Sequence, residues 1–384
     1  MSARLLVGPT WKILFISLMV AGALVGAVPG AAAASPAGHW TRVATPNASS
    51  GDNGLLGVAV VSPHLAWAVG GSDAGSLIMR WNGTAWKQQP SFKPHDPYSQ
   101  AGFFDMAATS PANAWAIGII ANGLEYRTLA VRWDGTKWTR VPSPNPGGYA
   151  SDILQGVATT SPTNAWAVGQ YLNGTGNQKT LILHWDGTAW THVPSPTPGS
   201  DSTLLRVTAT SPTNAWAVGY IGYYHTLIEH WNGTAWTLIP SLDGSYDANF
   251  LYGVAATSTT NAWAVGESCA VPACTALILH WDGTTWTRIA SPQPGPATQL
   301  YAVAATSPTD AWAVGHYGSG QHGPYHTLIE HWNGTAWTLV PSPNGSRFNI
   351  LYAVAASSPA SLWAVGNYYN YVTATDQTLA LHCC

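Results

Sequence analysis

Charge is what this chain has least of. Asp, Glu, Lys and Arg make up 8% of its 384 residues, and 17 acidic against 14 basic side chains leave a formal net charge of −3. A nucleic-acid partner requires a basic stripe that neutralises phosphates. No basic run follows the N-terminus, so the composition argues against nucleic-acid binding.

Long apolar runs are also missing, except for one near the N-terminus. Residues 13–28 are all apolar or small, but this run is shorter than the about 20 residues that a membrane span requires. Arg4 and Lys12 precede it, and small residues at Ala32–Ala34 follow it. This order is typical of a secretory signal. We therefore expect residues 1–34 to be a signal peptide and the mature protein, residues 35–384, to be secreted with no membrane span.

Cysteine is scarce as well, with four residues in two pairs. Cys269 and Cys274 enclose a short connection, and an oxidising compartment favours a disulfide between them. Cys383 and Cys384 are adjacent, and such neighbours bridge only with strain, so we expect them to be free or paired between chains. No His or carboxylate stands at ligand spacing from either pair, and the sequence predicts neither a metal nor a cofactor.

Tryptophan and glycine, by contrast, are abundant, with 21 and 39 residues. Most of them belong to a repeat of about 50 residues, a period typical of propellers and arrays. Each copy reads as an apolar run, Ser-Pro-Thr-Asn, Ala-Trp-Ala-Val-Gly, a variable stretch, Thr-Leu-Ile-Leu-His-Trp, Asp-Gly or Asn-Gly, and Thr-Ala-Trp-Thr-Arg-Val. The first Trp of each copy is Trp67, Trp115, Trp166, Trp216, Trp263, Trp312 or Trp363.

Four short strands fit each copy, because the segments are rich in β-branched and aromatic residues and lack a helical period. The Asp-Gly and Asn-Gly pairs favour a hairpin between the last two strands. With a two-residue loop, Trp185 and Trp190 share one face; a three-residue loop changes this register. The first strand of most copies carries Gly or Ala at one position, as at Gly57, Gly156 and Gly253. We infer that it is the inner strand of a propeller blade and that the Trp residues fill the widening space between blades.

The last copy stops at Cys384 without a fourth strand, and residues 39–47 match the fourth strand at 137–145. The prediction is therefore an all-β fold: a seven-bladed β-propeller of four-stranded antiparallel blades, closed by an N-terminal strand around Trp40, forming one monomeric domain. The repeats are expected near residues 55–98, 103–148, 154–200, 204–245, 251–296, 300–346 and 351–384.

The unit resembles the kelch repeat of galactose-oxidase-type propellers. Trp166–Gly169, Leu181–Trp185 and Trp190 occupy the positions of the kelch aromatic, apolar and Trp residues. The resemblance covers all seven units and implies a seven-bladed propeller. The kelch Gly doublet occurs only at Gly70-Gly71. The resemblance does not extend to the copper site of galactose oxidase, because neither Cys pair fits its cross-linked Cys.

Function is expected where the copies differ. The Ser-Pro and Asp-Gly turns share one end of the ring and hardly vary, whereas the loops between the second and third strands vary strongly. Such loops on a rigid scaffold usually carry binding sites, and their aromatic and polar residues suit sugar rings. Loops that have drifted without a shared purpose remain the alternative. The candidate residues are Tyr171, Tyr220, Tyr223, Tyr224, His225, His316, Tyr317, Tyr325, Tyr368, Tyr369 and Tyr371.

Two charged residues stand on the inner strand, where other copies have Gly or Ala: Asp105 and Arg206. We expect them to line the channel mouth, to pair with each other or with water, and we count them as candidate ligand contacts. A His or Arg precedes the Trp of each third strand, but equivalent positions lie far apart around a ring, so they predict no metal site. Glu229 and Glu330 precede two of these His residues and are expected to make surface pairs.

The sequence thus favours a secreted, non-catalytic binding or scaffold module with a glycan or protein ligand. The alternative is a hydrolase or lyase that acts on polysaccharide at the same end of the ring. A glycosidase needs two carboxyl groups a few ångströms apart, and the acidic residues outside the repeated turns are scattered.

Overall fold

The computed structural model describes residues 38–96, 99–148, 151–222, 225–241, 248–270, 273–320 and 323–384, which form 28 strands. The predicted signal peptide lies outside these residues. The first strands of the repeats are β2 (Asn53–Ser62), β6 (Ser99–Ser110), β10 (Asp152–Ser161), β14 (Ser202–Ser211), β18 (Ala248–Ser258), β22 (Ala297–Ser307) and β26 (Asn349–Ser358). The second strands are β3 (Leu65–Ser72), β7 (Asn113–Asn122), β11 (Asn164–Leu172), β15 (Asn214–Ile221), β19 (Asn261–Ala270), β23 (Asp310–Gly318) and β27 (Ser361–Asn370).

The third strands are β4 (Gly75–Trp81), β8 (Glu125–Trp133), β12 (Gln178–Trp185), β16 (His225–Trp231), β20 (Ala273–Trp281), β24 (Tyr325–Trp332) and β28 (Thr375–Cys383). The fourth strands are β5 (Trp86–Gln88), β9 (Trp138–Val141), β13 (Trp190–His192), β17 (Trp236–Leu238), β21 (Trp286–Arg288), β25 (Trp337–Leu339) and, from the start of the chain, β1 (Trp40–Val43).

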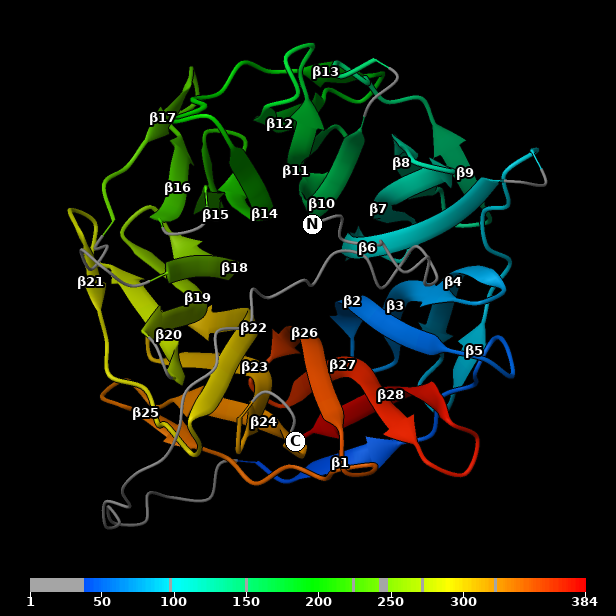
Figure 1. Cartoon of the computed structure of the whole chain (residues 1–384), viewed down its shortest axis with the longest axis vertical. Helices are drawn as coiled ribbons and strands as arrows, with labels where there is room; N and C mark the ends of the chain where they lie inside the picture. Colours follow the sequence, from blue (N-terminus) through cyan, green and yellow to red (C-terminus); the bar gives the residue numbers. More distant parts are fainter. Residues whose placement is uncertain are drawn as a thin grey trace, which may run out of the picture.

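Hydrogen bonding joins these strands into repeated four-stranded antiparallel groups, which we call units 1 to 7 in the order of their first strands. Units 1 to 4 are separate sheets, and units 5 and 6 are linked into one eight-stranded sheet by a single parallel pair, Cys274 with Ala297. In the last sheet the order is β1-β28-β27-β26, because β1 pairs antiparallel with β28. The units lie around a common centre, with β1 beside β28 (Figure 1).

Small residues allow the first strands to meet at the centre of the ring. Each first strand contacts those of the two neighbouring units, including β26 with β2. A Cβ added to Gly57 would lie 2.8 Å from the Asp105 Cα atom, and one added to Gly156 would lie 2.7 Å from the Arg206 Cα atom. These distances leave no room for a side chain at Gly57 and Gly156, each of which lies against a neighbouring strand that carries a charged residue at the same position.

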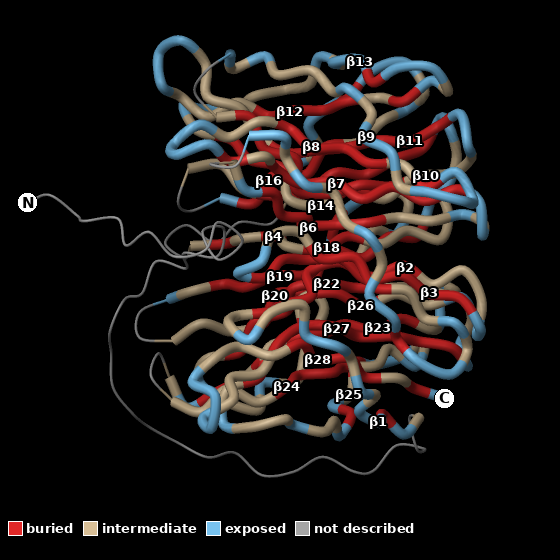
Figure 2. Tube along the Cα trace, turned by 90° about the vertical axis from the view of Figure 1, so that its right-hand side faces the viewer, coloured by how far each residue is buried: buried red, intermediate tan, exposed pale blue. Residues whose placement is uncertain are grey.

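Tryptophan fills the space between neighbouring units. Trp166 of unit 3 is buried and contacts Trp231 and Trp236 of unit 4, with ring centroids 4.9 and 5.2 Å apart. Where β1 meets the preceding unit, Trp40 packs against Trp312 at 5.6 Å. Buried residues therefore follow the middle of the strands, and exposed residues lie mostly in the turns and loops (Figure 2). The inter-unit role predicted for Trp agrees with these contacts.

The repeated turns form one uniform end of the ring. The Trp185 indole N–H donates to the Pro162 carbonyl, 3.1 Å away, in the Ser-Pro-Thr-Asn turn. In the hairpin, the Asp186 Oδ1 atom accepts hydrogen bonds from the Thr188 and Ala189 backbone N–H groups. Trp185 pairs directly with Trp190, so the loop has four residues rather than the two or three considered above, because the Asp side chain forms part of the turn.

Both cysteine pairs are joined in this structure. A disulfide links Cys269 to Cys274, and another links Cys383 to Cys384. The expectation that the terminal pair is free or bridged between chains is therefore wrong for this structure. Among the described residues there is no helix long and apolar enough to cross a membrane.

Candidate functional site

A ring of side chains surrounds the centre at the end with the variable loops. Each first strand contains a register shift just before the Gly or Ala position, as between Leu251 and Gly253, and the extra residue of such a bulge is re-aimed. Neighbouring extra residues contact one another: Tyr301 lies 5.5 Å from Tyr252 and 5.4 Å from Tyr352. We call this set the collar; it comprises Leu56, Phe104, Gln155, Leu205, Tyr252, Tyr301 and Tyr352.

The two charged inner-strand residues lie next to the collar and face each other. Asp105 Oδ2 is 4.0 Å from Arg206 Nε and accepts a hydrogen bond of 2.9 Å from the Val157 backbone N–H. Arg206 Nη1 donates to the Gln155 carbonyl at 2.8 Å, and Nη2 lies 3.5 Å from the Leu56 carbonyl in unit 1. Burial raises the pKa of Asp105, and the Arg206 charge opposes this shift. The predicted pairing is confirmed, and it ties unit 4 to units 1, 2 and 3.

Glu267 organises a buried polar network on the opposite side of the collar. It accepts hydrogen bonds from the Tyr252 hydroxyl at 2.6 Å and from the Gln299 amide, whose carbonyl accepts the Tyr301 hydroxyl at 2.6 Å. Burial raises the pKa of Glu267, although these hydrogen bonds oppose the shift. Burial also raises the pKa of the Tyr252 and Tyr301 hydroxyls. Each carboxylate oxygen therefore has a partner, and the network fixes two collar tyrosines.

The same carboxylate lies beside a cysteine pair. Glu267, Cys269 and Cys274 place their ligand-type atoms within 4.8 Å of one another. The expectation that no carboxylate stands at ligand spacing from either Cys pair is therefore wrong for Glu267, which shares one face of β19 with Cys269 at period two, while Cys274 pairs with Cys269 across the sheet. Both sulfurs are bound in the disulfide, so neither is a thiolate ligand.

Aromatic rings continue outward from the collar over units 6 and 7. Tyr301 stacks on His316 at 5.7 Å, and His316 lies 4.6 Å from Tyr325. Tyr325 contacts Phe348 at 5.6 Å, and Phe348 lies 6.4 Å from Tyr371. Tyr371 also lies 5.0 Å from Tyr369. We call the set Tyr301, His316, Tyr325, Phe348, Tyr369 and Tyr371 the aromatic row.

The aromatic row runs from buried to exposed positions. His316 is 5% exposed, whereas Tyr371 is 56% exposed beside Val372, which is 95% exposed. Burial lowers the pKa of His316 to about 4, so this imidazole is neutral at neutral pH. Its Nδ1 atom is buried and has no hydrogen-bond partner in the described part of the chain. The row therefore offers neutral aromatic surface at its exposed end, while the unpartnered His316 Nδ1 atom stays buried.

The predicted candidates do not all converge. His316, Tyr325, Tyr369 and Tyr371 belong to the aromatic row, whereas other candidates pack locally in separate units: Tyr171 on His192, Tyr220 on Phe250, Tyr317 on His326, and Tyr368 beneath Arg42. His225 is exposed at the start of β16. Tyr223 and Tyr224 lie outside the described residues. The sequence reasoning missed Tyr301, Phe348, Glu267 and Gln299, because bulges and loop packing leave no periodic signal.

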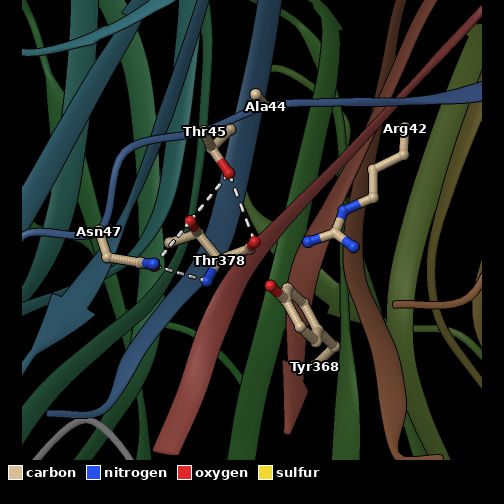
Figure 3. A pocket seen from close by; sticks show the side chains of 6 residues that line it. All are labelled: Arg42, Ala44, Thr45, Asn47, Tyr368 and Thr378. Carbon is tan, nitrogen blue, oxygen red and sulfur yellow. Dashed lines mark hydrogen bonds between the residues drawn. The ribbon is translucent and has the colours of Figure 1, made fainter. Parts of the chain in front are cut away.

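A shallow, open cavity of 320 Å³ lies where β1 joins the last unit, with Arg42, Ala44 and Asn47 exposed at its rim (Figure 3). It is lined by Arg42, Ala44, Thr45, Asn47, Tyr368 and Thr378. The Arg42 guanidinium lies 4.2 Å above the Tyr368 ring. Thr45 Oγ1 is 2.8 Å from Thr378 Oγ1, and the Asn47 side-chain oxygen accepts hydrogen bonds of 3.0 Å from the Thr378 backbone N–H and hydroxyl. Segments from the two ends of the described chain thus build one cavity.

The His residues that precede the Trp of the third strands contact turns within their own units. His184 Nε2 is 2.8 Å from Asn164 Oδ1 in the turn of its own unit, and its ring lies 4.3 Å from Trp166. His230 and His280 repeat this arrangement with Asn214 and Asn261. Burial lowers the pKa of all three His residues. Each imidazole therefore supports one turn as a neutral group.

The surface pairs expected for Glu229 and Glu330 are wrong, because both side chains are fully buried between units. Burial raises the pKa of each carboxyl to about 8. Ser291 of the preceding unit donates to Glu330 at 2.9 Å, whereas neither oxygen of Glu229 has a partner among the described residues. The side chains at the Glu229 and Glu330 position face a neighbouring unit, and the residue pattern along a single strand does not reveal such a contact.

Comparison with known proteins gives the class of fold. No model of a known protein family and no curated protein matches the chain. Solved structures do match. YCF48 from Cyanidioschyzon merolae is 15% identical, with 90% of this chain and 98% of that chain covered and a TM-score of 0.56. The WD40 β-propeller domain of Doa1 is 11% identical, with 90% and 97% covered and a TM-score of 0.54.

A third match is a protein of unknown function from Dyadobacter fermentans, which is 10% identical, with 91% and 99% covered and a TM-score of 0.51. At these identities the likeness concerns the fold alone. The chain is an all-β propeller of repeated four-stranded sheets. The propellers named here are of the YCF48 and WD40 types, so the kelch assignment stays a prediction.

Proposed function

We propose that this protein is a secreted, monomeric, seven-bladed propeller that binds a ligand at its variable end and does not catalyse a reaction. Two observations support the seven-bladed ring: the first strands contact one another in sequence order, and β1 pairs with β28. A propeller is a rigid support for variable loops, a combination suited to binding or scaffolding. The N-terminal pattern of charge, apolar run and small residues supports secretion.

The aromatic row carries the proposal for the ligand. Its rings form a continuous series from Tyr301 at the collar to the exposed Tyr371. Aromatic faces stack on the apolar faces of sugars, and neighbouring hydroxyl and imidazole groups bond sugar hydroxyls. A low net charge of −3 suits an uncharged or weakly charged partner. We therefore propose a glycan, with a protein surface as the second type of ligand.

A glycan array with the secreted protein tests this proposal. Tyr371→Ala is expected to weaken binding at least tenfold, because stacking on the most exposed ring of the row is lost. Tyr317→Ala is the matched control, since Tyr317 packs on His326 outside the row. Absence of binding to every glycan, or equal loss in both variants, contradicts the glycan proposal; capture of a protein ligand that requires Tyr371 favours the second type.

The hydrolase or lyase alternative depends on the buried acids near the collar. Both are already engaged: Asp105 with Arg206 and a backbone N–H, and Glu267 with Tyr252 and Gln299. A polysaccharide-degrading enzyme requires a carboxyl group that is free to transfer a proton or attack. Release of reducing or unsaturated ends by the wild-type protein, abolished in Glu267→Gln, is the result that favours the enzyme.

A further inference from the structure

The cavity between β1 and the last unit combines a repeated structural clamp with two side chains found together only there. In other units, an amide at the same position also holds the third strand: Asn145 accepts from the Thr128 backbone N–H, and Asn344 from the Thr327 N–H, both at 2.9 Å. The clamp of Asn47 and Thr378 is therefore part of the architecture. It forms a polar wall in which the Thr45 and Thr378 hydroxyl protons are already engaged, while both oxygens can still accept hydrogen bonds from a ligand.

Arg42 and Tyr368 are particular to the last unit. At the Arg42 position the other units have Gln88, Arg140, His192, Leu238, Arg288 and Leu339, and at the Tyr368 position they have Ser72, Ile120, Tyr171, Ile221, Ser268 and Tyr317. Only the last unit places an Arg over a Tyr, at 4.2 Å. Arg42 has no acidic partner among the described residues.

Both side chains retain unused bonding capacity. The five N–H donors of a guanidinium match a carboxylate in a bidentate geometry, and among the described residues the Arg42 guanidinium packs on the Tyr368 ring. The Tyr368 hydroxyl likewise makes no hydrogen bond within the described residues. In Figure 3 the guanidinium and the phenol hydroxyl lie on the same side of the cavity, facing Thr45 and Thr378. An anion placed there meets two donors.

The lining of the cavity specifies the rest of the ligand. Arg42 is its single charge, and the other groups are hydroxyls, one amide and the Ala44 methyl. One cation favours a singly charged carboxylate, and a hydroxyl-lined wall favours a hydroxylated ligand. The volume of 320 Å³ is near the lower end of the roughly 300–1,000 Å³ typical of small-molecule sites, so a small ligand is favoured over a long chain.

We propose that this cavity binds an acidic sugar, with the carboxylate on Arg42 and the Tyr368 hydroxyl and the ring hydroxyls toward Thr45 and Thr378. The inference goes beyond the proposed glycan binding at the aromatic row by adding a separate site, and it names uronic acids as the ligand class of that site. Arg42 and Thr45 follow from the N-terminal strand, whereas Tyr368 and Thr378 belong to the C-terminal unit. A bound uronate therefore also connects the two ends of the ring and stabilises their pairing.

Calorimetric titration of the full chain with free galacturonate tests the site, because this probe is too small to need the aromatic row. Galacturonate is expected to bind, galactose to bind at least tenfold more weakly, and acetate more weakly than galacturonate. Arg42→Gln is expected to reduce galacturonate affinity at least tenfold and Tyr368→Phe severalfold. Arg288→Gln is the matched control, an exposed Arg at the same strand position in unit 5, and is expected to bind normally.

Equal binding of galactose and galacturonate overturns the role of the carboxylate, and equal binding of acetate overturns the sugar assignment. Unchanged affinity in Arg42→Gln, or loss in Arg288→Gln as well, overturns the site. Tyr368→Phe keeps the ring beneath Arg42, so it tests the hydroxyl even if Arg42→Gln folds poorly. If Tyr371→Ala leaves uronate binding unchanged, this site is independent of the aromatic row. Loss of glycan-array binding alone then contradicts the glycan site at the aromatic row and not the uronate site at Arg42.

Discussion

At the scale of single residues, the repeats act as internal controls for one another. Units 3, 5 and 7 have Leu183, Leu279 and Leu381 where units 4 and 6 have Glu229 and Glu330. In unit 3 the Thr180 hydroxyl binds the hydroxyl of Ser195. Unit 5 has Ala276 at the Thr180 position, so Ser291, which corresponds to Ser195, can donate to Glu330 instead. Glu229 has no such donor among the described residues. Its burial therefore costs stability whenever the unfolded chain would ionise it.

Glu229→Leu is expected to stabilise the protein increasingly as the pH rises. Burial raises the folded-state pKa to about 8, above the unfolded value of about 4.5, so the folded state binds more protons and the wild type loses stability between these values as pH rises. The gain is expected to be roughly 2–4 kcal/mol at pH 8 and much smaller at pH 4. Thermal denaturation at both pH values measures it.

Glu330→Leu is the control for this substitution, because it also removes the Ser291 hydrogen bonds. Its gain at pH 8 is expected to be smaller. A gain from Glu229→Leu that does not depend on pH would contradict the role of ionisation and point to packing alone.

Asn261→Asp is expected to make the protein less sensitive to acid. Burial lowers the pKa of His280 below its ordinary value of 6.5, so the folded state binds fewer protons and stability is lost as pH falls through about 6.5. Unit 6 already has the alternative pair, with Asp310 2.7 Å from His331. A carboxylate beside His280 favours its charged form. The melting temperature of the variant at pH 5, relative to pH 7, should fall less than that of the wild type, whereas Asn261→Ala should give no such protection.

At the scale of strands, β1 has only four residues, so side-chain contacts hold it in place more than its few backbone hydrogen bonds do. Trp40 is 2% exposed and packs on Trp312, while Thr45 and Asn47 bond the Thr378 region beyond the strand. Each of the other fourth strands is joined to its third strand by a short hairpin, but β1 reaches β28 from the other end of the sequence. Its docking therefore lacks the entropic advantage of a short loop.

Trp40→Ala is expected to loosen β1 selectively. Truncation of a buried Trp costs about 3–5 kcal/mol through lost packing and the resulting cavity. Trp86→Ala removes the equivalent ring, which contacts Trp363 at 4.8 Å, from a strand held by its hairpin. Limited proteolysis should cleave residues 44–52 faster in Trp40→Ala than in Trp86→Ala at matched stability. Equal cleavage would indicate that β1 is anchored by its backbone pairing.

At the scale of the whole molecule, the first strands are packed against those of both neighbouring units, including β26 against β2, and β1 covers the edge of β28. Deletion of residues 39–47 is expected to expose the β28 edge and the face of Trp312, lowering the melting temperature and promoting association between chains. Calorimetry and light scattering measure both effects, and an added peptide of residues 38–48 should reverse them. An unchanged melting temperature would refute the role of β1 in closing the ring.

The sequence predicted the parts of this molecule that repeat. The spacing of the Trp residues, the small residues at Gly57 and Gly156, and the pairing of Asp105 with Arg206 all agree with the structure. It did not predict the collar, because the extra residue of a bulge breaks the period of two on which strand patterns depend. It named His316, Tyr325, Tyr369 and Tyr371 but missed Tyr301 and Phe348 and did not join the six into one row, since Tyr325 and Phe348 lie far apart in the sequence pattern and meet only in the fold. Features that arise between units or between loops have no periodic signal.

The uniform hairpins have a consequence for the chemical ageing of the protein. Three of them contain Asn-Gly, at Asn82, Asn232 and Asn333, a sequence prone to spontaneous deamidation, and three contain Asp-Gly, at Asp134, Asp186 and Asp282. The Oδ1 atom makes the same three bonds in both kinds, as Asn82 and Asp186 show. An Asp at these positions therefore preserves the turn. The Asn82→Asp variant should gain one negative charge and separate by ion exchange while its melting temperature stays unchanged, whereas isoaspartate, the other product of Asn-Gly deamidation, adds a carbon to the backbone and should lower it.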